Sequence, residues 1–389
     1  MNRKKILFDL LFAQPIGNSK FHGGGEYIKA VFQYLIDNYN EKVEVAAFYD
    51  YDRFIDDWIK DKISAHGIKT YDIKSVQDVP SLLMDGKYDV FYSGLAYSYD
   101  SVHFPDGVKK IGTIHGLRTL EEPCDKYTAV YNNQGAVRYI KDVLKWKLIQ
   151  NPGNTFEQKE KEKFNRIINS FDDIITVSNH TKYAIQSWLC GVSSDKIHVF
   201  YTPAKYVDSE DTQIKLDTKC KYIFMLGGNR WIKNSARCIL ALEQLFDDVR
   251  LEGYSVVLCG KLPPKIAALI HNKERYQLLD YVKPEELETL YKNCDFFLYL
   301  SLNEGFGMPP LEAMQYGKTV ITSPICSIPE VCGEAVYYAN PYDLKEIQNR
   351  ILWAADTKKP VDQVLAHFNS VKNKQLQDLK GLCDFIIGE

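Results

Sequence analysis

The segment Phe296–Glu312, FFLYLSLNEGFGMPPLE, joins a short apolar run to two glycines and then to two prolines. The run Phe296–Leu300 is rich in aromatic residues and has the length of a buried strand. The glycines let the chain turn sharply and let a ligand approach the backbone closely. The prolines suit the first turn of a helix, where backbone N–H groups have no helical partner. The segment therefore predicts a strand, a glycine turn and a helix.

The same alternation of short apolar runs and helix-length segments extends in both directions along the chain. It predicts strands over 5–12, 43–49, 89–93, 110–115, 173–177, 196–201, 222–227, 255–259, 277–282, 296–300, 319–322 and 335–338. This pattern is typical of parallel sheets covered by helices on both faces. We therefore expect an α/β fold with two Rossmann-like doubly wound domains. Their strand ends should face a central cleft, because ligands bind beyond the carboxyl ends of such strands.

The domain limits follow from a polar stretch near 203–221, whose composition suits a linker. We expect an N-terminal acceptor domain over 1–205 and a C-terminal donor domain over 206–370. A final helix within 371–389 should pack back toward the N-terminal domain. The long polar segment 124–171 reads as a helical elaboration of the first domain, and 264–272 as a helix of the second.

Composition excludes several classes of protein. The formal charge of −3 argues against nucleic-acid binding, which needs a basic face. The nine cysteines show no paired spacing, so they predict no zinc site and favour a reducing cytoplasm. No apolar run reaches the roughly 20 residues that span a bilayer. We expect a cytoplasmic protein, attached at most peripherally to the inner face of the membrane. The basic group Lys141, Lys145, Trp146 and Lys147 either faces that membrane or is an ordinary amphipathic helix face.

Two glutamates flank the glycine turn: Glu304 precedes the predicted helix and Glu312 lies within it. Helical spacing would separate their backbones by roughly 12 Å. Retaining glycosidases need carboxyl groups about 5–5.5 Å apart, so the two are not a hydrolytic pair. Separate parts of one elongated ligand fit them better. For either glutamate alone, a turn or a favourable first-turn charge is a sufficient explanation.

The segment Leu226–Asn234 likewise follows a predicted strand and opens a helix. It contains Arg230 and Lys233, and fixed cations stabilise the negative charge of a departing diphosphate. For Arg230 alone, an ordinary surface loop is also plausible.

These segments resemble the donor-binding signature of retaining glycosyltransferase family 4, the glycosyl transferases group 1 of the GT-B fold. The resemblance implies that Glu304 contacts sugar hydroxyls near the reaction centre and that Glu312 binds ribose hydroxyls. It implies that Lys233 and Arg230 bind the diphosphate, with Arg230 shifted relative to the family's common form. It also implies donor contacts at six further positions. These are Gly228, Val282, Phe306, Gly307, Met308 and Leu311, the last four through backbone N–H groups.

Two further segments of the first half enter through the same resemblance. The loop His22–Glu26 lacks the third glycine of a dinucleotide fingerprint, since Ile28 stands in its place. The family places Gly24 and Gly25 near the diphosphate and acceptor, although a helix-entry turn explains them equally well. His115 resembles the active-site histidine that contacts the donor sugar, and Arg118 is a candidate acceptor or phosphate contact.

The expected activity is transfer of a hexose-type sugar, with anomeric retention, from a nucleoside diphosphate sugar. The acceptor is a glycan, a lipid-linked saccharide or a protein glycan. No cofactor is expected beyond the donor itself. Asp50–Asp52 resembles a metal-binding triplet of another glycosyltransferase fold, but we predict no required metal. Two alternatives stay open: a non-catalytic partner subunit of the same fold, and a sugar-nucleotide epimerase.

Overall fold

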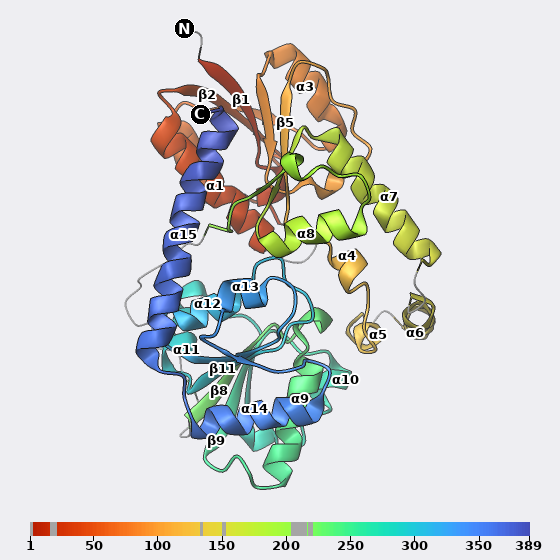
Figure 1. The fold of residues 1–389 in the computed structure, drawn as a ribbon, viewed down its shortest axis with the longest axis vertical. Coiled ribbons are helices and arrows are strands. Elements are labelled where there is room, and N and C mark those ends of the chain that lie inside the picture. Colours follow the sequence, from red (N-terminus) through yellow and green to blue (C-terminus); the bar gives the residue numbers. More distant parts are fainter. Residues whose placement is uncertain (1–2, 16–21, 133–134, 150–152, 204–215, 217–220) are drawn as a thin grey trace. The chain divides into compact units, whose positions relative to one another are not determined.

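The computed structural model describes residues 3–15, 22–132, 135–149, 153–203, 216 and 221–389 (Figure 1). They form two compact units. The first unit comprises Met1–Leu117, Gln158–Lys205 and Lys372–Glu389, and the second comprises Arg118–Glu157 and Tyr206–Val371. The segment Arg118–Glu157 thus packs with the C-terminal half, although the sequence pattern assigned it to the first domain. Most of the predicted linker, 204–215 and 217–220, lies outside the described residues.

The first unit contains a seven-stranded parallel sheet in the order β3-β2-β1-β4-β5-β6-β7. Its strands are β1 (Lys4–Asp9), β2 (Val43–Tyr49), β3 (Lys69–Asp72), β4 (Val90–Ser93), β5 (Lys109–Ile114), β6 (Asp173–Thr176) and β7 (Ile197–Val199). In the interior strand β1, Ile6 pairs with Val45 on one side and Val90 on the other. Residues 6–8 have no exposed surface, as expected for a strand covered on both faces.

Helices flank this sheet in the order of a doubly wound fold. They are α1 (Gly23–Tyr39), α2 (Asp57–Ala65), α3 (Val79–Gly86), α7 (Thr155–Ser170), α8 (Asn179–Trp188) and the C-terminal part of α15 (Val361–Ile387). The end of α15 is fastened to the first unit: Tyr39 donates to Asp384 at 2.6 Å, and Gln375 donates to the Thr202 carbonyl at 2.6 Å. The helix begins ten residues before the predicted start.

The second unit contains a six-stranded parallel sheet in the order β10-β9-β8-β11-β12-β13. Its strands are β8 (Lys221–Leu226), β9 (Tyr254–Cys259), β10 (Tyr276–Leu279), β11 (Phe296–Tyr299), β12 (Thr319–Thr322) and β13 (Tyr337–Tyr338). Its helices are α4 (Arg118–Glu121), α5 (Thr128–Tyr131), α6 (Ala136–Ile149), α9 (Ser235–Asp247), α10 (Pro264–Ala267), α11 (Pro284–Asn293), α12 (Met308–Met314), α13 (Ile328–Cys332) and α14 (Leu344–Asp356). Apolar residues of β8, β9, β11, α9 and α14 form its core. The prediction of two parallel α/β domains is therefore confirmed.

Helix α10 is shorter than the predicted 264–272. After Ala267 the chain tightens, because Leu269 and Ile270 donate to carbonyls three residues earlier. Ile270 is thereby turned into the core, with 5% of its surface exposed. Tertiary packing overrides the helical propensity of these residues.

A buried guanidinium fastens the segment after α4 to the second unit. Arg237 on α9 forms an ion pair with Asp125 at 2.7 Å, and both side chains are over 90% buried. Its guanidinium carbon also lies 5.0 Å from the ring centroids of both Tyr127 and Tyr342. An ion pair and cation–π contacts with two aromatic rings together stabilise a buried arginine strongly. The segment is therefore a fixed wall of the second unit.

Among the described helices, none combines the length and apolar character needed to cross a lipid bilayer.

Candidate donor-binding site

Two loops of the second unit meet at the carboxyl ends of β8 and β11. The backbone N–H of Leu302 donates to the carbonyl of Ile232 at 2.8 Å. The Ser301 hydroxyl donates to the same carbonyl at 3.2 Å. These bonds hold the loop after β11 against the loop after β8, so residues distant in the sequence share one site. The position agrees with the rule that open α/β sheets bind ligands at this edge.

Lys233, Glu304 and Tyr299 form the polar centre of this site. Lys233 Nζ lies 2.5 Å from Glu304 Oε1 and also donates to the Tyr299 hydroxyl. The Tyr299 hydroxyl donates to the same Glu304 oxygen at 2.6 Å. The side chains of Lys233 and Glu304 are only 12% and 13% exposed. The sequence predicted Lys233 and Glu304 as separate contacts, and the structure brings them together.

The charges of Lys233 and Glu304 each favour the ionised form of the other. Burial acts to raise the pKa of Glu304, but the Lys233 charge and hydrogen bonds from Lys233, Tyr299 and Ser301 outweigh it, so this pKa lies below its ordinary value. Burial lowers the pKa of Lys233, and the positive charges of Arg230 and Arg118 act in the same direction, against the attraction of Glu304. The site therefore holds an ionised carboxylate and a cation surrounded by further positive charge.

Glycines shape the loop after β8. Gly228 has no room for a side chain, because a Cβ there would lie 2.4 Å from the Gly260 carbonyl oxygen. Gly227 has φ +91°, and a Cβ on it would meet Lys233 Cγ at 2.6 Å. The glycines thus let the Lys233 stem lie flat against the backbone. In the loop after β11, Gly307 has φ +101°, a left-handed conformation that favours glycine.

The other predicted donor contacts lie around this centre. Glu312, on α12, accepts a hydrogen bond from the Tyr291 hydroxyl at 2.9 Å, and burial raises its pKa. Phe306 and Leu311 are buried, whereas Val282 and Met308 are half-buried. Their roles toward a donor stay predictions.

The two predicted arginines lie in the second unit with exposed side chains. Arg230 has no side-chain hydrogen bond or ion pair within the part of the chain that the structure describes. Arg118 begins α4, and its charge reaches Lys233, since it contributes to the lowered pKa of that lysine. Arg118 was predicted as part of a first-domain loop, and the structure places it with the donor loops instead.

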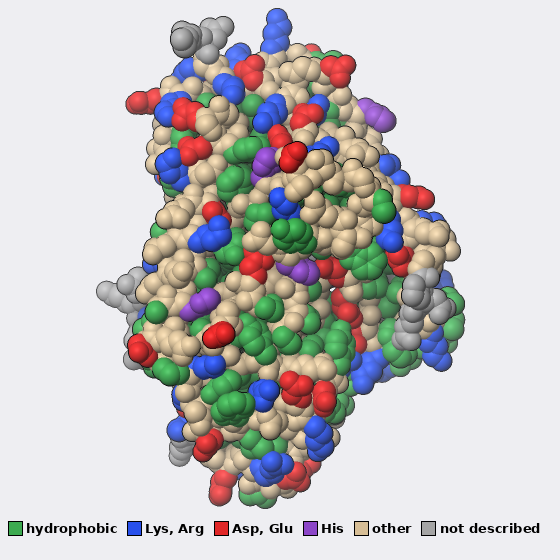
Figure 2. Space-filling model, in the orientation of Figure 1, with side chains coloured by type: hydrophobic (Ala, Val, Ile, Leu, Met, Phe, Trp, Pro, Cys, Tyr) green, Lys and Arg blue, Asp and Glu red, His purple; other side chains and the backbone are tan. Residues whose placement is uncertain are grey.

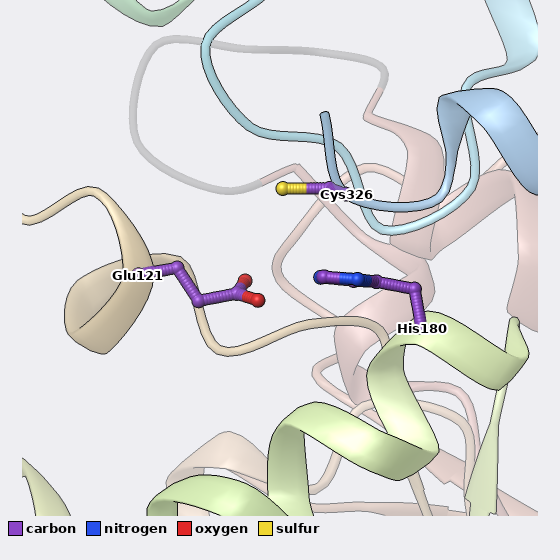
Figure 3. Close-up of side chains that lie close together, drawn as sticks. All are labelled: Glu121, His180 and Cys326. Atoms are coloured by element: carbon purple, nitrogen blue, oxygen red, sulfur yellow. The ribbon is translucent and has the colours of Figure 1, made fainter. Parts of the chain in front are cut away.

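Asn303 links the donor loop to α4 and to the loop after β12. Its amide donates to Glu121 Oε2 at 2.9 Å and to Cys326 Sγ at 3.1 Å. Figure 3 shows the Glu121 and Cys326 side chains pointing into the same space, and it also labels His180, which lies on α8 of the first unit. The bonds from Asn303 fix the residue directly before Glu304.

His115, Gly24 and Gly25 belong to the first unit. His115 Nε2 lies 2.9 Å from the Gly94 carbonyl oxygen, and the ring packs edge-on against Tyr27. A carbonyl only accepts, so we assign the proton to Nε2. Burial lowers the pKa of His115 to about 4, so the imidazole is neutral at pH 7.

The glycine loop before α1 is held by a second histidine. Gly25 N donates to His22 Nδ1 at 3.0 Å, which caps the helix. A Cβ on Gly25 would lie 3.0 Å from His22 Nε2, and one on Gly24 would lie 3.1 Å from Leu95. The helix-entry role is therefore observed, and a role toward ligands stays a prediction.

The sequence interpretation missed Tyr299 and Tyr291, the partners of the two glutamates. Both are fully buried tyrosines with a carboxylate as hydrogen-bond acceptor. A signal was present for Tyr299, because a polar group at the end of an otherwise apolar strand needs a buried partner.

Comparison with known proteins matches the second unit. Residues 207–364 match the family described as glycosyl transferases group 1. This region is therefore similar to that family over less than half of the chain. The predicted resemblance to glycosyl transferases group 1 is thereby confirmed for this region, and the Lys233 and Glu304 loops both lie inside it.

Curated relatives match parts of the chain. The O-antigen chain mannosyltransferase RfbU of Salmonella typhimurium is 28% identical over 184 residues, covering 46% of this chain and 49% of the relative. The serotype-specific mannosyltransferase WbdA of Escherichia coli is 36% identical over 103 residues, covering 24% of this chain and 13% of the relative. The chain therefore spans about half or less of the length of these relatives.

Solved structures match the whole chain in fold. A glycosyltransferase from Rickettsia africae has a TM-score of 0.65 at 14% identity, covering 100% of this chain and 99% of that one. Anabaena HepE in complex with UDP and glucose has a TM-score of 0.61 at 14% identity, covering 97% and 95%. The fold is that of GT-B glycosyltransferases.

Proposed function

We propose that this protein is a retaining glycosyltransferase that moves a hexose from a nucleoside diphosphate sugar to a hydroxyl group of a glycan or lipid-linked acceptor. The observation that carries the proposal is the cluster of Lys233, Glu304 and Tyr299 between two glycine loops of the region that is similar to glycosyl transferases group 1. Its relatives named as O-antigen mannosyltransferases support mannose as the sugar. The HepE structures with UDP and UDP-glucose support a nucleoside diphosphate as the carrier.

In this proposal the cationic groups bind the diphosphate. The positive charges of Arg230 and Arg118 repel that of Lys233. A bound diphosphate would attract all three cations and so offset this repulsion. Fixed cations stabilise the charge that develops on the leaving phosphate. The backbone N–H groups of Phe306 to Met308, beside the left-handed Gly307, supply further donors.

The carboxylates hold the sugar and the ribose. Glu304 is ionised and acceptor-only, so it binds sugar hydroxyls by charge-assisted hydrogen bonds. Glu312, whose pKa burial raises, takes the ribose hydroxyls. The acceptor hydroxyl attacks the anomeric carbon from the face the diphosphate leaves, and the leaving phosphate oxygen takes the acceptor proton. No metal and no covalent enzyme intermediate enters this scheme.

The proposal includes a peripheral contact with an anionic membrane through α6. Val137, Ile140, Leu144 and Leu148 are 53–70% exposed and follow helical spacing, so they form one apolar stripe. Lys141 and Lys147 are exposed beside it. An apolar stripe flanked by lysines is the pattern of a helix that lies in a lipid interface. In Figure 2 basic and hydrophobic side chains gather over this helix.

Donor screening tests the activity. The purified protein is incubated with GDP-mannose, UDP-glucose, UDP-galactose and UDP-N-acetylglucosamine, and nucleoside diphosphate release is measured with and without glycan acceptors. We expect one donor to bind, to be hydrolysed slowly and to be consumed faster with acceptor. Failure of every donor to bind at millimolar concentration overturns the proposal. Conversion of a donor to its epimer without acceptor establishes an epimerase instead.

A further inference from the structure

A cavity of about 180 Å³ opens in the second unit beside the donor loops. Arg118 and Trp231 are among the residues that line it. Trp231 stands between Arg230 and Lys233 in the loop after β8, and the Arg118 charge reaches Lys233. The cavity is therefore lined by a residue of the same loop that carries the proposed diphosphate cations.

The wall of the cavity is polar and of mixed character. It contains two carboxyl groups, Glu122 and Asp142, together with the guanidinium of Arg138, the amide of Asn132 and hydroxyls from Thr119 and Thr128. Arg138 Nε lies 3.3 Å from Asp142 Oδ1, and Asn132 donates to Asp142 at 2.9 Å. Glu122 accepts a hydrogen bond from Tyr342 at 2.9 Å. The lining thus contains both hydrogen-bond donors and acceptors.

This wall is rigid at its base. The ion pair of Arg237 with Asp125 holds the turn that leads into α5. The Asp125 N–H donates to the Thr128 hydroxyl at 2.8 Å, and the Tyr127 N–H donates to Asp125 at 2.9 Å. A pre-formed polar wall lowers the entropy that ligand binding costs.

Mixed donors and acceptors suit hydroxyl groups, since each hydroxyl both donates and accepts. The carboxyl groups of Glu122 and Asp142 make the cavity less suited to a phosphate than to hydroxyl groups. The volume is about six times the ~30 Å³ that a water molecule occupies in the liquid, which leaves room for one sugar ring. Trp231 also lines the cavity, and an aromatic side chain is the usual apolar contact of a sugar ring.

We propose that this cavity binds one pyranose unit of the acceptor glycan, through hydrogen bonds to Glu122 and Arg138 and contact with Trp231. The proposal rests on the proposed glycosyl transfer and names its acceptor subsite. Arg138 and Asp142 also place the cavity on α6, the helix with the apolar stripe. The glycan of a lipid-linked acceptor would thus bind on α6, the same helix that is proposed to contact the membrane.

The test measures acceptor binding apart from donor chemistry. The full chain is titrated by calorimetry, in the presence of GDP and separately of UDP, with methyl glycosides of mannose, glucose and galactose and with inorganic phosphate. The variants are Glu122→Gln and Arg138→Gln. Their matched controls are Glu334→Gln and Arg250→Gln, exposed residues that do not line the cavity.

We expect one glycoside to bind the wild type, and both cavity variants to bind it at least about fivefold more weakly. Donor hydrolysis and thermal midpoint should change little in all four variants. The subsite is overturned if the cavity variants bind the glycoside as the wild type does, if phosphate alone binds, if no glycoside binds, or if donor hydrolysis falls in parallel. Glycosyl transfer as such fails only if the wild type neither binds nor hydrolyses any nucleotide sugar, so the two failures are distinct.

Discussion

Lys233 Nζ lies 2.5 Å from Glu304 Oε1 across 71 residues of sequence, and each charge keeps its partner ionised in a largely buried position. The Tyr299 hydroxyl is shared between them. A bound diphosphate sugar would redistribute these contacts, the cation toward phosphate and the carboxylate toward sugar hydroxyls.

Glu304→Gln should reduce kcat by about 100-fold or more, because a neutral amide stabilises a cationic sugar centre far less than a carboxylate does. Donor affinity, measured by calorimetry, should change much less. Glu334→Gln, at an exposed position of the same unit, serves as the control. Full transfer activity in Glu304→Gln would remove this residue from the reaction centre.

Lys233→Met should destabilise the second unit by about 3 kcal/mol, since it leaves Glu304 buried without its partner. Burial would then raise the pKa of Glu304 without opposition from the lysine. The double variant Lys233→Met with Glu304→Gln should be less destabilised than the sum of the single variants, with a coupling of about 1–3 kcal/mol. Urea unfolding measures all four proteins. Additive losses would show that the pair does not couple.

Gly228→Ala should cost about 1–3 kcal/mol of stability, because its Cβ would lie 2.4 Å from a carbonyl oxygen and 2.5 Å from Leu258. The same loop donates from Gly228 N to the Cys259 carbonyl, and a backbone shift would strain that bond. Gly23→Ala is the matched control, since a Cβ there meets nothing within 4 Å. Equal thermal midpoints for the two variants would contradict the assigned close approach.

His115 should make the free energy of unfolding fall as the pH is lowered. Its folded pKa of about 4 lies below the ordinary 6.5, so the unfolded chain binds the proton more readily between these values. The contribution of neutral His115 to folding stability is complete above pH 6.5 and is lost as the pH falls toward 4. His115→Gln should therefore lose less stability than the wild type over this range, in urea unfolding at several pH values. His22 also faces this ring and enters the wild-type profile.

His271, whose pKa is shifted in the opposite direction to that of His115, supplies the control. The pKa of His271 is raised, chiefly by its hydrogen bond to Asp247, so its small contribution is present below pH 6.5 and fades as pH rises. His271→Gln should thus lose stability mainly on the acid side. Identical pH profiles for the two variants would refute the assignment for His115.

Leu144→Ser with Leu148→Ser should weaken sedimentation with vesicles of anionic phosphatidylglycerol, because it interrupts the apolar stripe of α6. Both side chains are more than half exposed, so the fold should tolerate the change. Leu376→Ser, at an exposed position of α15, is the matched control. Wild-type protein that sediments equally with neutral phosphatidylcholine, or with neither, would exclude an anionic membrane contact.

The sequence predicted the sheets well because parallel strands buried on both faces are continuous apolar runs. It missed β3, since Lys69–Asp72 is a short edge strand with polar ends and no such run. Edge strands need less apolar surface, so composition reveals them poorly.

The donor loops were also predictable, because glycine turns after strands leave a local signature. The pairing of Lys233 with Glu304 was not, since it depends on the bond from Leu302 to Ile232 across two loops. The membership of Arg118–Glu157 in the second unit was likewise hidden. It depends on the contact between Arg237 and Asp125, which are separated by 112 residues and leave no local pattern in the sequence.

The Arg237 anchor bears on how the protein can be divided or recombined. A fragment that starts after residue 205 would carry Arg237 but lack Asp125 and Tyr127, and so would expose a guanidinium to water that the intact chain encloses. Exchange of C-terminal halves between relatives would likewise pair this arginine with a foreign segment. Recombination that keeps the second unit intact must therefore transfer residues 118–157 together with residues 206–371.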